Sequence, residues 1–350
     1  MAKRVLVTGG AGFIPSNFIH HLLAKTPYEV VSLDALTYAG NLDNLSGAMS
    51  HERLSFVHGD IRDAELVRDV VSEVDVIVNA AAESHVEKSI DEGAREFVTT
   101  NVEGTQILLD AVREAPVERF ILISSSEVYG TAERAPMDEE HPLNPRSPYA
   151  ATKAGADRLV YSYFTTYDLP VVIVRPFNSY GPRQHPEKVI PRFITQALSG
   201  EPLTIHGDGH ASRDWLYVDD DAEAIEAIIA ADIDGLAGEV VNVATGIDIS
   251  VRDVADAVLA AVGADDDVVF VEERLGQVDR HIGSTDKLER LTGWRARTSF
   301  ERGLEQTVDW YRANEVWWRA LTARDSVSSS SGPGPRRSGS CARHASATCS

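Results

Sequence analysis

The chain has 350 residues, of which 43% are hydrophobic and 25% are charged, enough for the packed core of one large domain or two smaller ones. Its formal net charge is −21, and because residues 326–350 carry three arginines and no acid, residues 1–325 carry −24. So acidic a body would repel nucleic acid and anionic membrane surfaces, and neither is expected as a partner.

Short apolar, β-branched runs alternate with helical patterns through the first half of the chain. Strands are predicted at 4–9, 29–34, 54–60, 74–81, 119–126 and 170–177. Helices are predicted at 15–25, 64–72, 94–114 and 148–167. This alternation is typical of an α/β fold, a doubly wound parallel Rossmann sheet with helices on both faces.

The pattern loosens after residue 178, where proline and glycine become frequent. Further helices are predicted near 188–199, 219–231, 250–262 and 301–320, and strands at 239–244 and 267–272. We interpret 1–178 as a Rossmann domain and 179–322 as a smaller C-terminal α/β lobe, with later segments free to return to the first sheet. The last helix carries Trp310, Tyr311, Trp317 and Trp318, for which we predict core or subunit packing rather than a ligand role.

The two ends of the chain give expectations about the location of the protein and about a disordered tail. The start, "MAKR", runs directly into a strand without a signal peptide, and no window of about 18 apolar residues occurs, so a cytoplasmic protein is expected. Residues 326–350 are rich in Ser, Gly, Pro and Arg and are predicted to be a disordered tail. Both cysteines, Cys341 and Cys349, lie in that tail, which excludes a disulfide or cysteine nucleophile from the body.

A glycine turn, "TGGAGFIPSN" (8–17), follows the first predicted strand and opens the first helix, the context in which such a turn binds a dinucleotide. Gly9 and Gly12 let the backbone approach a pyrophosphate, and the N–H groups from Gly12 through Phe13 to Ile14 would face it. Position 15 is proline where a third glycine is usual. First-turn N–H groups lack intrahelical partners, so Pro15 need not break the helix. Its ring could still push the helix outward, so Pro15 is expected to weaken cofactor binding or slow its exchange without abolishing it.

Carboxylates end the next two predicted strands. Asp34 stands where an acid can accept both adenosine ribose hydroxyls. No Lys or Arg occurs at 34–50 to receive a 2′-phosphate, which favours NAD over NADP as the cofactor. Asp60 and Ile61 are expected near the adenine ring. Asp60 is also a candidate N-cap for the helix at 64–72, and the two roles are compatible.

A catalytic constellation is predicted from "SSSEVYG" (124–130) and "YAATK" (149–153). Tyr149 and Lys153 share one face of a helix, so the lysine ammonium is expected to lower the phenol pKa and make Tyr149 a base near neutral pH. Ser125, beyond the fifth strand, could bind the hydroxyl that Tyr149 deprotonates. Glu127 could remove the proton made acidic by a neighbouring ketone.

The chain resembles the extended short-chain dehydrogenases/reductases, and within them the nucleotide-sugar 4,6-dehydratases typified by dTDP-glucose 4,6-dehydratase. The resemblance covers about residues 3–320 and includes the motifs above together with "LDALTYAGNLDNL" (33–45), "AAESHVEKSI" (81–90), "TNVEGTQILLDA" (100–111), "YGPRQHPEKVIP" (180–191), "RDWLYVDD" (213–220) and "GWRARTSFERGLEQTVDWY" (293–311). It implies tightly held NAD, oxidation at sugar C4, elimination of water across C5–C6, hydride return to C6, and a homodimer.

The resemblance also implies roles for individual residues. Lys153 would bind the nicotinamide ribose, Ala81 would contact the cofactor, and Ser125 stands in place of the usual threonine. The residues implied to bind the nucleotide sugar are Ser84, Asn178, Lys188, Arg213 and Arg280. His85 is interpreted as a helix cap that shapes the pocket, and Trp215 as packing. No metal is expected, because no His and Asp stand at metal-ligand spacing.

One position departs from the dTDP-glucose enzymes, which have Asp-Glu where this chain has Ser126-Glu127. That aspartate protonates the departing C6 hydroxyl, and serine cannot do so at neutral pH. The Ser-Glu pair resembles GDP-mannose dehydratases, in which one glutamate serves as base and acid, and also UDP-glucuronate decarboxylases. A decarboxylase or 4-epimerase of the same fold therefore remains an alternative, as does a non-catalytic NAD-binding protein.

Overall fold

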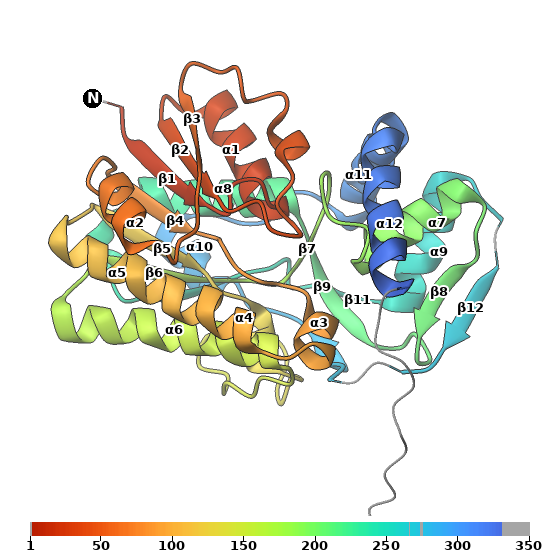
Figure 1. The fold of residues 1–350 in the computed structure, drawn as a ribbon. Helices are drawn as coiled ribbons and strands as arrows, with labels where there is room; N and C mark the ends of the chain where they lie inside the picture. Colours follow the sequence, from red (N-terminus) through yellow and green to blue (C-terminus); the bar gives the residue numbers. More distant parts are fainter. Residues whose placement is uncertain (1, 266, 274–275, 331–350) are drawn as a thin grey trace, which may run out of the picture.

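The computed structural model describes residues 2–265, 267–273 and 276–330, and its centre is a seven-stranded parallel sheet (Figure 1). The strand order is β10-β6-β5-β4-β1-β2-β3, which confirms the predicted doubly wound α/β fold. The strands are β1 (Arg4–Thr8), β2 (Glu29–Asp34), β3 (Leu54–His58), β4 (Val76–Asn79), β5 (Arg119–Ile123), β6 (Val171–Pro176) and β10 (Val240–Val243). All six pairings are parallel.

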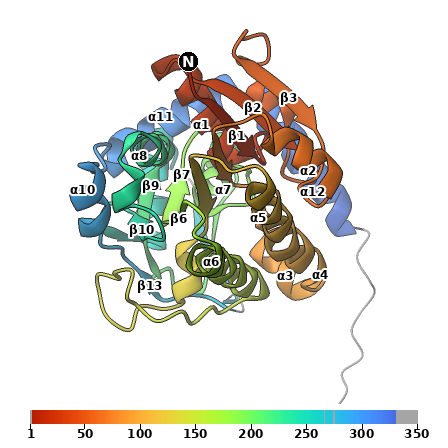
Figure 2. The ribbon, with the colours of Figure 1, turned by 90° about the vertical axis from the view of Figure 1, so that its left-hand side faces the viewer.

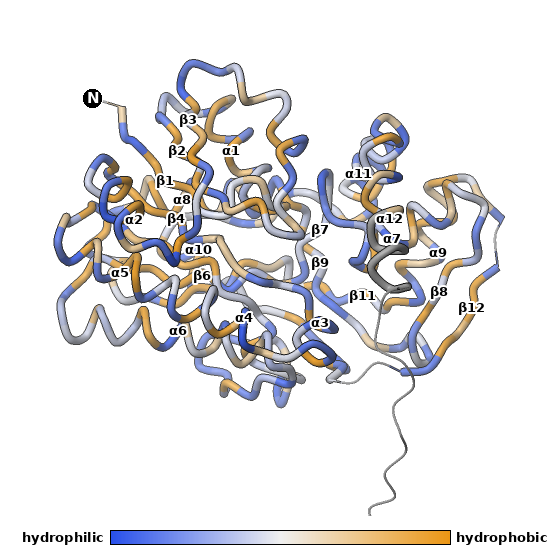
Figure 3. Tube along the Cα trace, in the orientation of Figure 1, coloured by the Kyte–Doolittle hydropathy of each residue, from blue (hydrophilic) through white to orange (hydrophobic). Residues whose placement is uncertain are grey.

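Helices cover both faces of this sheet (Figure 2). One face packs against α1 (Phe13–Lys25), α8 (Val218–Ala230) and α10 (Asp286–Thr292). The other packs against α2 (Ala64–Val71), α5 (Thr105–Glu114) and α6 (Pro148–Tyr167). The central strands are apolar along their length because neither face meets water, as the orange colour of β1, β4 and β6 indicates (Figure 3).

The smaller lobe has its own core. Its four-stranded sheet runs β11 (Asp248–Ser250), β9 (Ser212–Tyr217), β13 (Arg280–His281), with β7 (Asn178–Tyr180) also paired to β9. A second pair joins β8 (Leu203–His206) to β12 (Val268–Val271). Four helices surround these strands: α7 (Val189–Ser199), α9 (Val251–Val262), α11 (Phe300–Ala313) and α12 (Glu315–Ser330).

The chain crosses between the two lobes more than once. After β7 and β9 it returns through α8, which packs on α1, and then through β10, which pairs with β6 (Figure 1). It leaves again for β11, α9 and β12, and comes back once more as α10. Segments beyond residue 178 therefore complete the first sheet and one of its helical layers.

Several details differ from the sequence-based prediction, and three of them concern helices. The helix predicted at 94–114 is interrupted: α4 (Arg95–Phe97) leads into a π-helical turn (Val98–Gly104) before α5. A short helix, α3 (Val86–Asp91), follows His85, where a helix cap was expected but no helix bounds were predicted. The last aromatic helix is two helices: Asn314 leaves the helical conformation (φ −119°, ψ 40°) at the end of α11, and its side-chain N–H donates to the Trp310 carbonyl at 2.8 Å.

The end of the chain falls partly outside the description. Residues 326–330, which the sequence placed in the tail, continue α12, whereas 331–350, with both cysteines, lie outside the described residues. Over the described part of the chain, no helix combines the length and apolarity needed to cross a membrane.

Candidate active site

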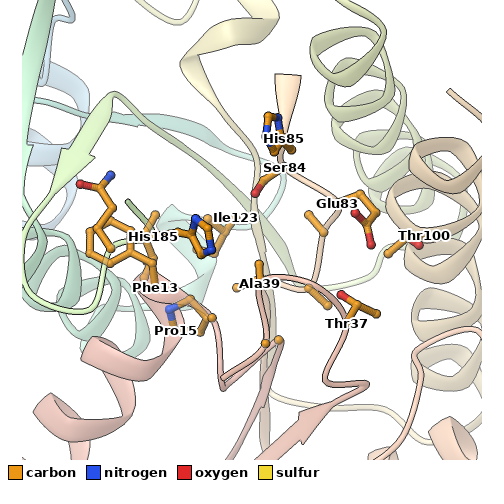
Figure 4. Close-up of a pocket in the computed structure, with 18 of the residues that line it drawn as sticks. Phe13, Pro15, Thr37, Ala39, Glu83, Ser84, His85, Thr100, Ile123 and His185 are labelled. Atoms are coloured by element: carbon orange, nitrogen blue, oxygen red, sulfur yellow. The ribbon is translucent and has the colours of Figure 1, made fainter. Parts of the chain in front are cut away.

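A cavity of about 440 Å³ opens at the carboxyl ends of the parallel strands, between the two lobes (Figure 4). This edge is where an open α/β sheet binds ligands. The cavity is lined by most of the residues that the sequence singled out, namely Gly9, Gly12, Phe13, Ile14, Asp34, Asp60, Ile61, Ala81, Ser84, Ser125, Glu127, Tyr149, Lys153, Asn178 and Lys188. Ser126, Arg213 and Arg280 are not among its lining residues.

The glycine turn approaches its neighbours so closely that side chains are excluded. Gly9 has φ +69°, and a Cβ there would lie 2.8 Å from the Cα of Ala81. Gly12 is the N-cap of α1, and a Cβ on it would lie 3.0 Å from the Gly9 carbonyl oxygen. Pro15 is the third residue of α1, where no intrahelical N–H bond is lost, and its side chain reaches the cavity wall (Figure 4).

The acid that ends β2 is held by backbone groups. Asp34 is 7% exposed and accepts hydrogen bonds from the N–H groups of Ala11 at 2.9 Å and Leu36 at 2.7 Å. Burial raises the pKa of this carboxyl, and the two backbone bonds oppose the shift. Together with the close-packed glycines and the first N–H groups of α1, Asp34 makes this half of the cavity fit a dinucleotide.

Asp60 does not cap α2. That helix is capped by Asp63, whose carboxylate accepts from the N–H groups of Glu65 and Leu66. Asp60 instead pairs with Arg62 at 2.6 Å, and the hydrogen bond lowers the pKa of Asp60. Arg62 also lines the cavity. It lies outside residues 34–50, the range whose lack of cations favoured NAD over NADP, and its charge is paired with that of Asp60.

Helix α6 places Tyr149 and Lys153 one turn apart. Ser147 caps the helix and Pro148 is its first residue, which fixes its start directly before Tyr149. Lys153 is 5% exposed and donates from Nζ to the Ile123 carbonyl oxygen, at the end of β5, at 2.6 Å. Burial lowers the pKa of Lys153 to about 8.

The phenol pKa moves opposite to our expectation. Burial raises the pKa of Tyr149 to about 12, a hydrogen-bonding contact with Ser125 opposes the shift, and the charge of Glu127 adds to it. The expected lowering by Lys153 is absent because the lysine ammonium is directed at the Ile123 carbonyl.

The "SSSE" segment turns sharply after β5. Ser125 Oγ accepts the Glu127 N–H at 3.2 Å and caps a 3₁₀ helix, Ser126–Tyr129. This turn directs Ser125 and Glu127 to the cavity, while Ser126 is 2% exposed and lies outside the lining. The residue that departs from the dTDP-glucose pattern is thus one that the cavity wall does not include.

The cationic residues predicted to bind the nucleotide sugar fall into two groups. Lys188 reaches the cavity and donates from Nζ to the Ser84 carbonyl at 3.2 Å. Arg280 is half exposed and pairs with Asp248 at 2.7 Å, away from the cavity. Arg213, on β9, is partly buried; desolvation lowers its pKa, and the charge of Glu127 opposes that shift.

Asn178, on β7, carries an unsatisfied group into the cavity wall. Its Oδ1 is buried and finds no hydrogen-bond partner among the described residues. A buried acceptor without a donor is costly to keep, so this oxygen is suited to a donor group on a ligand.

Two histidines and a glutamate at the cavity were not predicted to act together. His85 caps α3, as expected, and its Nε2 also lies 3.0 Å from Glu187, on the loop before α7. Burial opposes ionisation of Glu187, yet Lys188 and His85 hold the pKa of Glu187 well below its ordinary value. His185 lies beside them and points into the cavity (Figure 4). The motif "QHPEK" (184–188) was the available signal.

Comparison with known proteins identifies the family of the chain. A family model for GDP-mannose 4,6 dehydratase matches residues 6–307. A low-salt glycan biosynthesis protein of Haloferax volcanii is 51% identical over 312 residues, covering 89% of this chain and 99% of that one. A dTDP-glucose 4,6-dehydratase of Streptomyces niveus is 42% identical over 339 residues, covering 95% and 100%. The structure of the Streptomyces venezuelae dTDP-glucose 4,6-dehydratase with NAD and TYD bound has a TM-score of 0.87 and 46% identity, covering 91% and 99%.

Fold, cavity and sequence matches thus define an extended short-chain dehydrogenase/reductase. The chain belongs to the nucleotide-sugar 4,6-dehydratase family. It is an NAD-dependent lyase that removes water from a nucleotide sugar, as the sequence predicted.

Proposed function

We propose that this enzyme acts on dTDP-glucose and that the predicted site residues carry out the reaction. The single observation that supports it best is that Ser125, Glu127, Tyr149 and Lys153 line the same cavity as the glycine turn. The nucleotide is proposed from the relatives, which include dTDP-glucose 4,6-dehydratases at 42% identity.

The first chemical task falls to Tyr149. Its ionised phenolate oxygen takes the proton of the sugar C4 hydroxyl while Ser125 hydrogen-bonds the same group. NAD, when bound, supplies the hydride acceptor at C4 and the hydride donor at C6. Because burial raises the pKa of Tyr149 to about 12, its ionisation needs added positive charge, which Lys153, one helical turn away on the same face, would supply only by turning its ammonium from the Ile123 carbonyl toward the phenol.

The second task falls to Glu127. A ketone at C4 makes the C5 proton acidic, and the Glu127 carboxylate removes it. The carboxyl, now protonated, gives that proton to the C6 hydroxyl, which leaves as water. One residue can serve as base and acid when elimination occurs on one face of the sugar, and this matches a wall that includes Glu127 but not Ser126.

Three groups are proposed to hold the nucleotide sugar. Lys188 presents a cation to the diphosphate, and the unsatisfied Oδ1 of Asn178 is suited to a hydroxyl or N–H donor elsewhere on the nucleotide sugar. Arg213 lies on β9, the strand that pairs with β7. Arg280 is the weakest of the predicted contacts, because Asp248 already pairs with it.

A panel of nucleotide sugars tests this assignment by the mass of the products. Loss of water from dTDP-glucose, at a rate well above that from UDP- or GDP-sugars, is the expected result. Loss of CO₂ from UDP-glucuronate would establish the decarboxylase instead. An unchanged mass with inverted C4 would establish the epimerase, which needs no base such as Glu127.

We also infer a cytoplasmic homodimer without nucleic-acid or membrane partners. The support is the charge of −24 on residues 1–325 and the surface of α6, where Tyr161 and Tyr167 are 40% and 45% exposed. Light scattering after gel filtration tests the dimer, and a monomer at micromolar concentration would contradict it.

A further inference from the structure

The last described helix brings an indole from the C-terminal lobe to the cavity. Trp317 and Leu321 of α12 line it together with the glycine turn. The Trp317 Nε1–H donates to Asn44 Oδ1 at 3.1 Å, and the two residues are 273 positions apart. In Figure 1 α12 lies with α7 and α11, so this hydrogen bond ties the C-terminal lobe to the Rossmann half.

Asn44 extends the connection to the glycine turn. It lies in a 3₁₀ helix, Leu42–Leu45, is 3% exposed, and donates from Nδ2 to the Ala11 carbonyl oxygen at 2.8 Å. The Asn41 N–H donates to the same oxygen at 3.1 Å, and the Ala11 N–H donates to Asp34 at 2.9 Å. The peptide groups on both sides of Ala11 are therefore held, which orients the N–H groups that follow at the start of α1.

The indole itself is well supported. It packs edge-to-face on Trp310 at 4.9 Å and on Tyr311 at 6.2 Å, and the Tyr311 hydroxyl donates to the Gln184 carbonyl. Its neighbour Trp318 is different: it is 2% exposed and its Nε1–H donates to the Tyr311 carbonyl at 3.0 Å, inside the C-terminal lobe. Two adjacent tryptophans thus make one contact across the lobes and one within a lobe.

We propose that Trp317 is a positioning residue for the cofactor, which holds Asn44 and, through it, the glycine turn in the geometry that retains NAD. The sequence predicted only packing for this side chain, and its place in the cavity wall adds a binding role. Loss of the one neutral hydrogen bond should speed NAD dissociation about three- to tenfold.

The test is the rate at which purified holoenzyme loses labelled NAD into an excess of unlabelled NAD. Trp317→Phe keeps an aromatic ring but removes the N–H donor, and should accelerate NAD loss. Activity that declines on dilution should return when NAD is added. Trp318→Phe is the matched control, since it removes an N–H of the same kind from the same helix, and it should leave the NAD loss rate unchanged.

Two outcomes overturn the proposal. One is an unchanged rate in Trp317→Phe, and the other is an equal acceleration in Trp318→Phe, which would assign the effect to general loosening of α12. Asn44→Leu removes the acceptor of the same hydrogen bond and should also accelerate NAD loss. Combined with Trp317→Phe it should add little, because both changes break one connection, whereas full additivity would contradict it. Wild-type protein that binds no NAD would overturn the cofactor site and this proposal together.

Discussion

The two sides of the cavity are built differently. The cofactor side uses backbone: Gly9 and Gly12 remove side chains, and Asp34 is itself fixed by two N–H groups. The substrate side uses side chains, with Lys188 and Asn178 at the wall and Arg213 on β9, the strand that pairs with β7. The backbone groups on the cofactor side belong to one contiguous motif. The side chains on the substrate side come from strands that meet only after folding. Mutations should therefore separate chemistry, substrate affinity and cofactor retention.

The largest effect is expected from Tyr149, which should change chemistry without weakening either side. Tyr149→Phe removes the proton acceptor and should lower kcat by about 10⁴-fold while NAD stays bound. Tyr161→Phe, on the same helix but 40% exposed, is the control. Product formation by mass spectrometry measures the loss, and a fall of less than tenfold would remove Tyr149 from its role.

The second-largest effect is expected from a change at Glu127. Glu127→Gln keeps the size of the side chain but cannot take or give the proton, so loss of water should slow about 10³-fold. Oxidation at C4 should survive and can be followed as reduced cofactor by absorbance. Glu140→Gln, on the surface, is the comparison. Water loss at the full rate in Glu127→Gln would show that another group is the base.

Lys153 lines the cavity, and the effect of burial on its pKa can be tested through the pH dependence of protein stability. Its pKa is about 8 when folded and about 10.4 when unfolded, so below pH 8 the charged form is buried at a cost, and above pH 10.4 neither state is charged. Stability of wild-type protein should rise across that window. Lys153→Met should raise the free energy of unfolding at pH 7 by up to about 3 kcal/mol and have little effect near pH 10.5.

Urea unfolding after removal of NAD measures this difference. Lys25→Met, at an exposed position, should change the free energy of unfolding by the same small amount at both pH values. The same stabilisation by Lys153→Met at both pH values would mean that burial does not lower the pKa of Lys153.

The two arginines sharpen the substrate side. Arg213→Gln should raise KM for the nucleotide sugar about tenfold, because a partly buried cation near a diphosphate is hard to replace. Arg280→Gln should change KM less than about twofold, since the Arg280–Asp248 pair is exposed. Equal effects would place the diphosphate between β9 and β13 rather than over Lys188.

Pro15 should have the smallest effect, confined to the cofactor side. Pro15→Gly removes a ring from the start of α1 and should slow NAD dissociation by less than about threefold. Unchanged retention would show that the third helical position accepts proline without cost. Faster loss would contradict the idea that the ring holds the helix away from the cofactor.

The sequence was most informative where structure is local. The strand at 29–34 and the helix at 148–167 have the predicted bounds, because an apolar run and a Ser-Pro start are complete signals in themselves. The same holds for the glycine turn and for Tyr149 and Lys153, which contiguous motifs place in one cavity.

Failures occurred where the outcome depends on distant partners. The short strands β7, β11 and β13 have too few residues for a periodic signal and exist because β9 pairs with them. The phenol pKa of Tyr149 was misjudged because a helical spacing does not reveal that Lys153 bonds to Ile123. The contact of Trp317 with Asn44 spans 273 positions and leaves no local pattern.

The return of β10 to pair with β6 has a consequence for how this enzyme can be altered. A cut near residue 178 would strip the sheet of its edge strand and α1 of its neighbour α8, so neither half is a transferable module. Exchange of substrate preference between relatives must therefore proceed by grafting loops and individual side chains, and chimeras joined at that point should fail to fold.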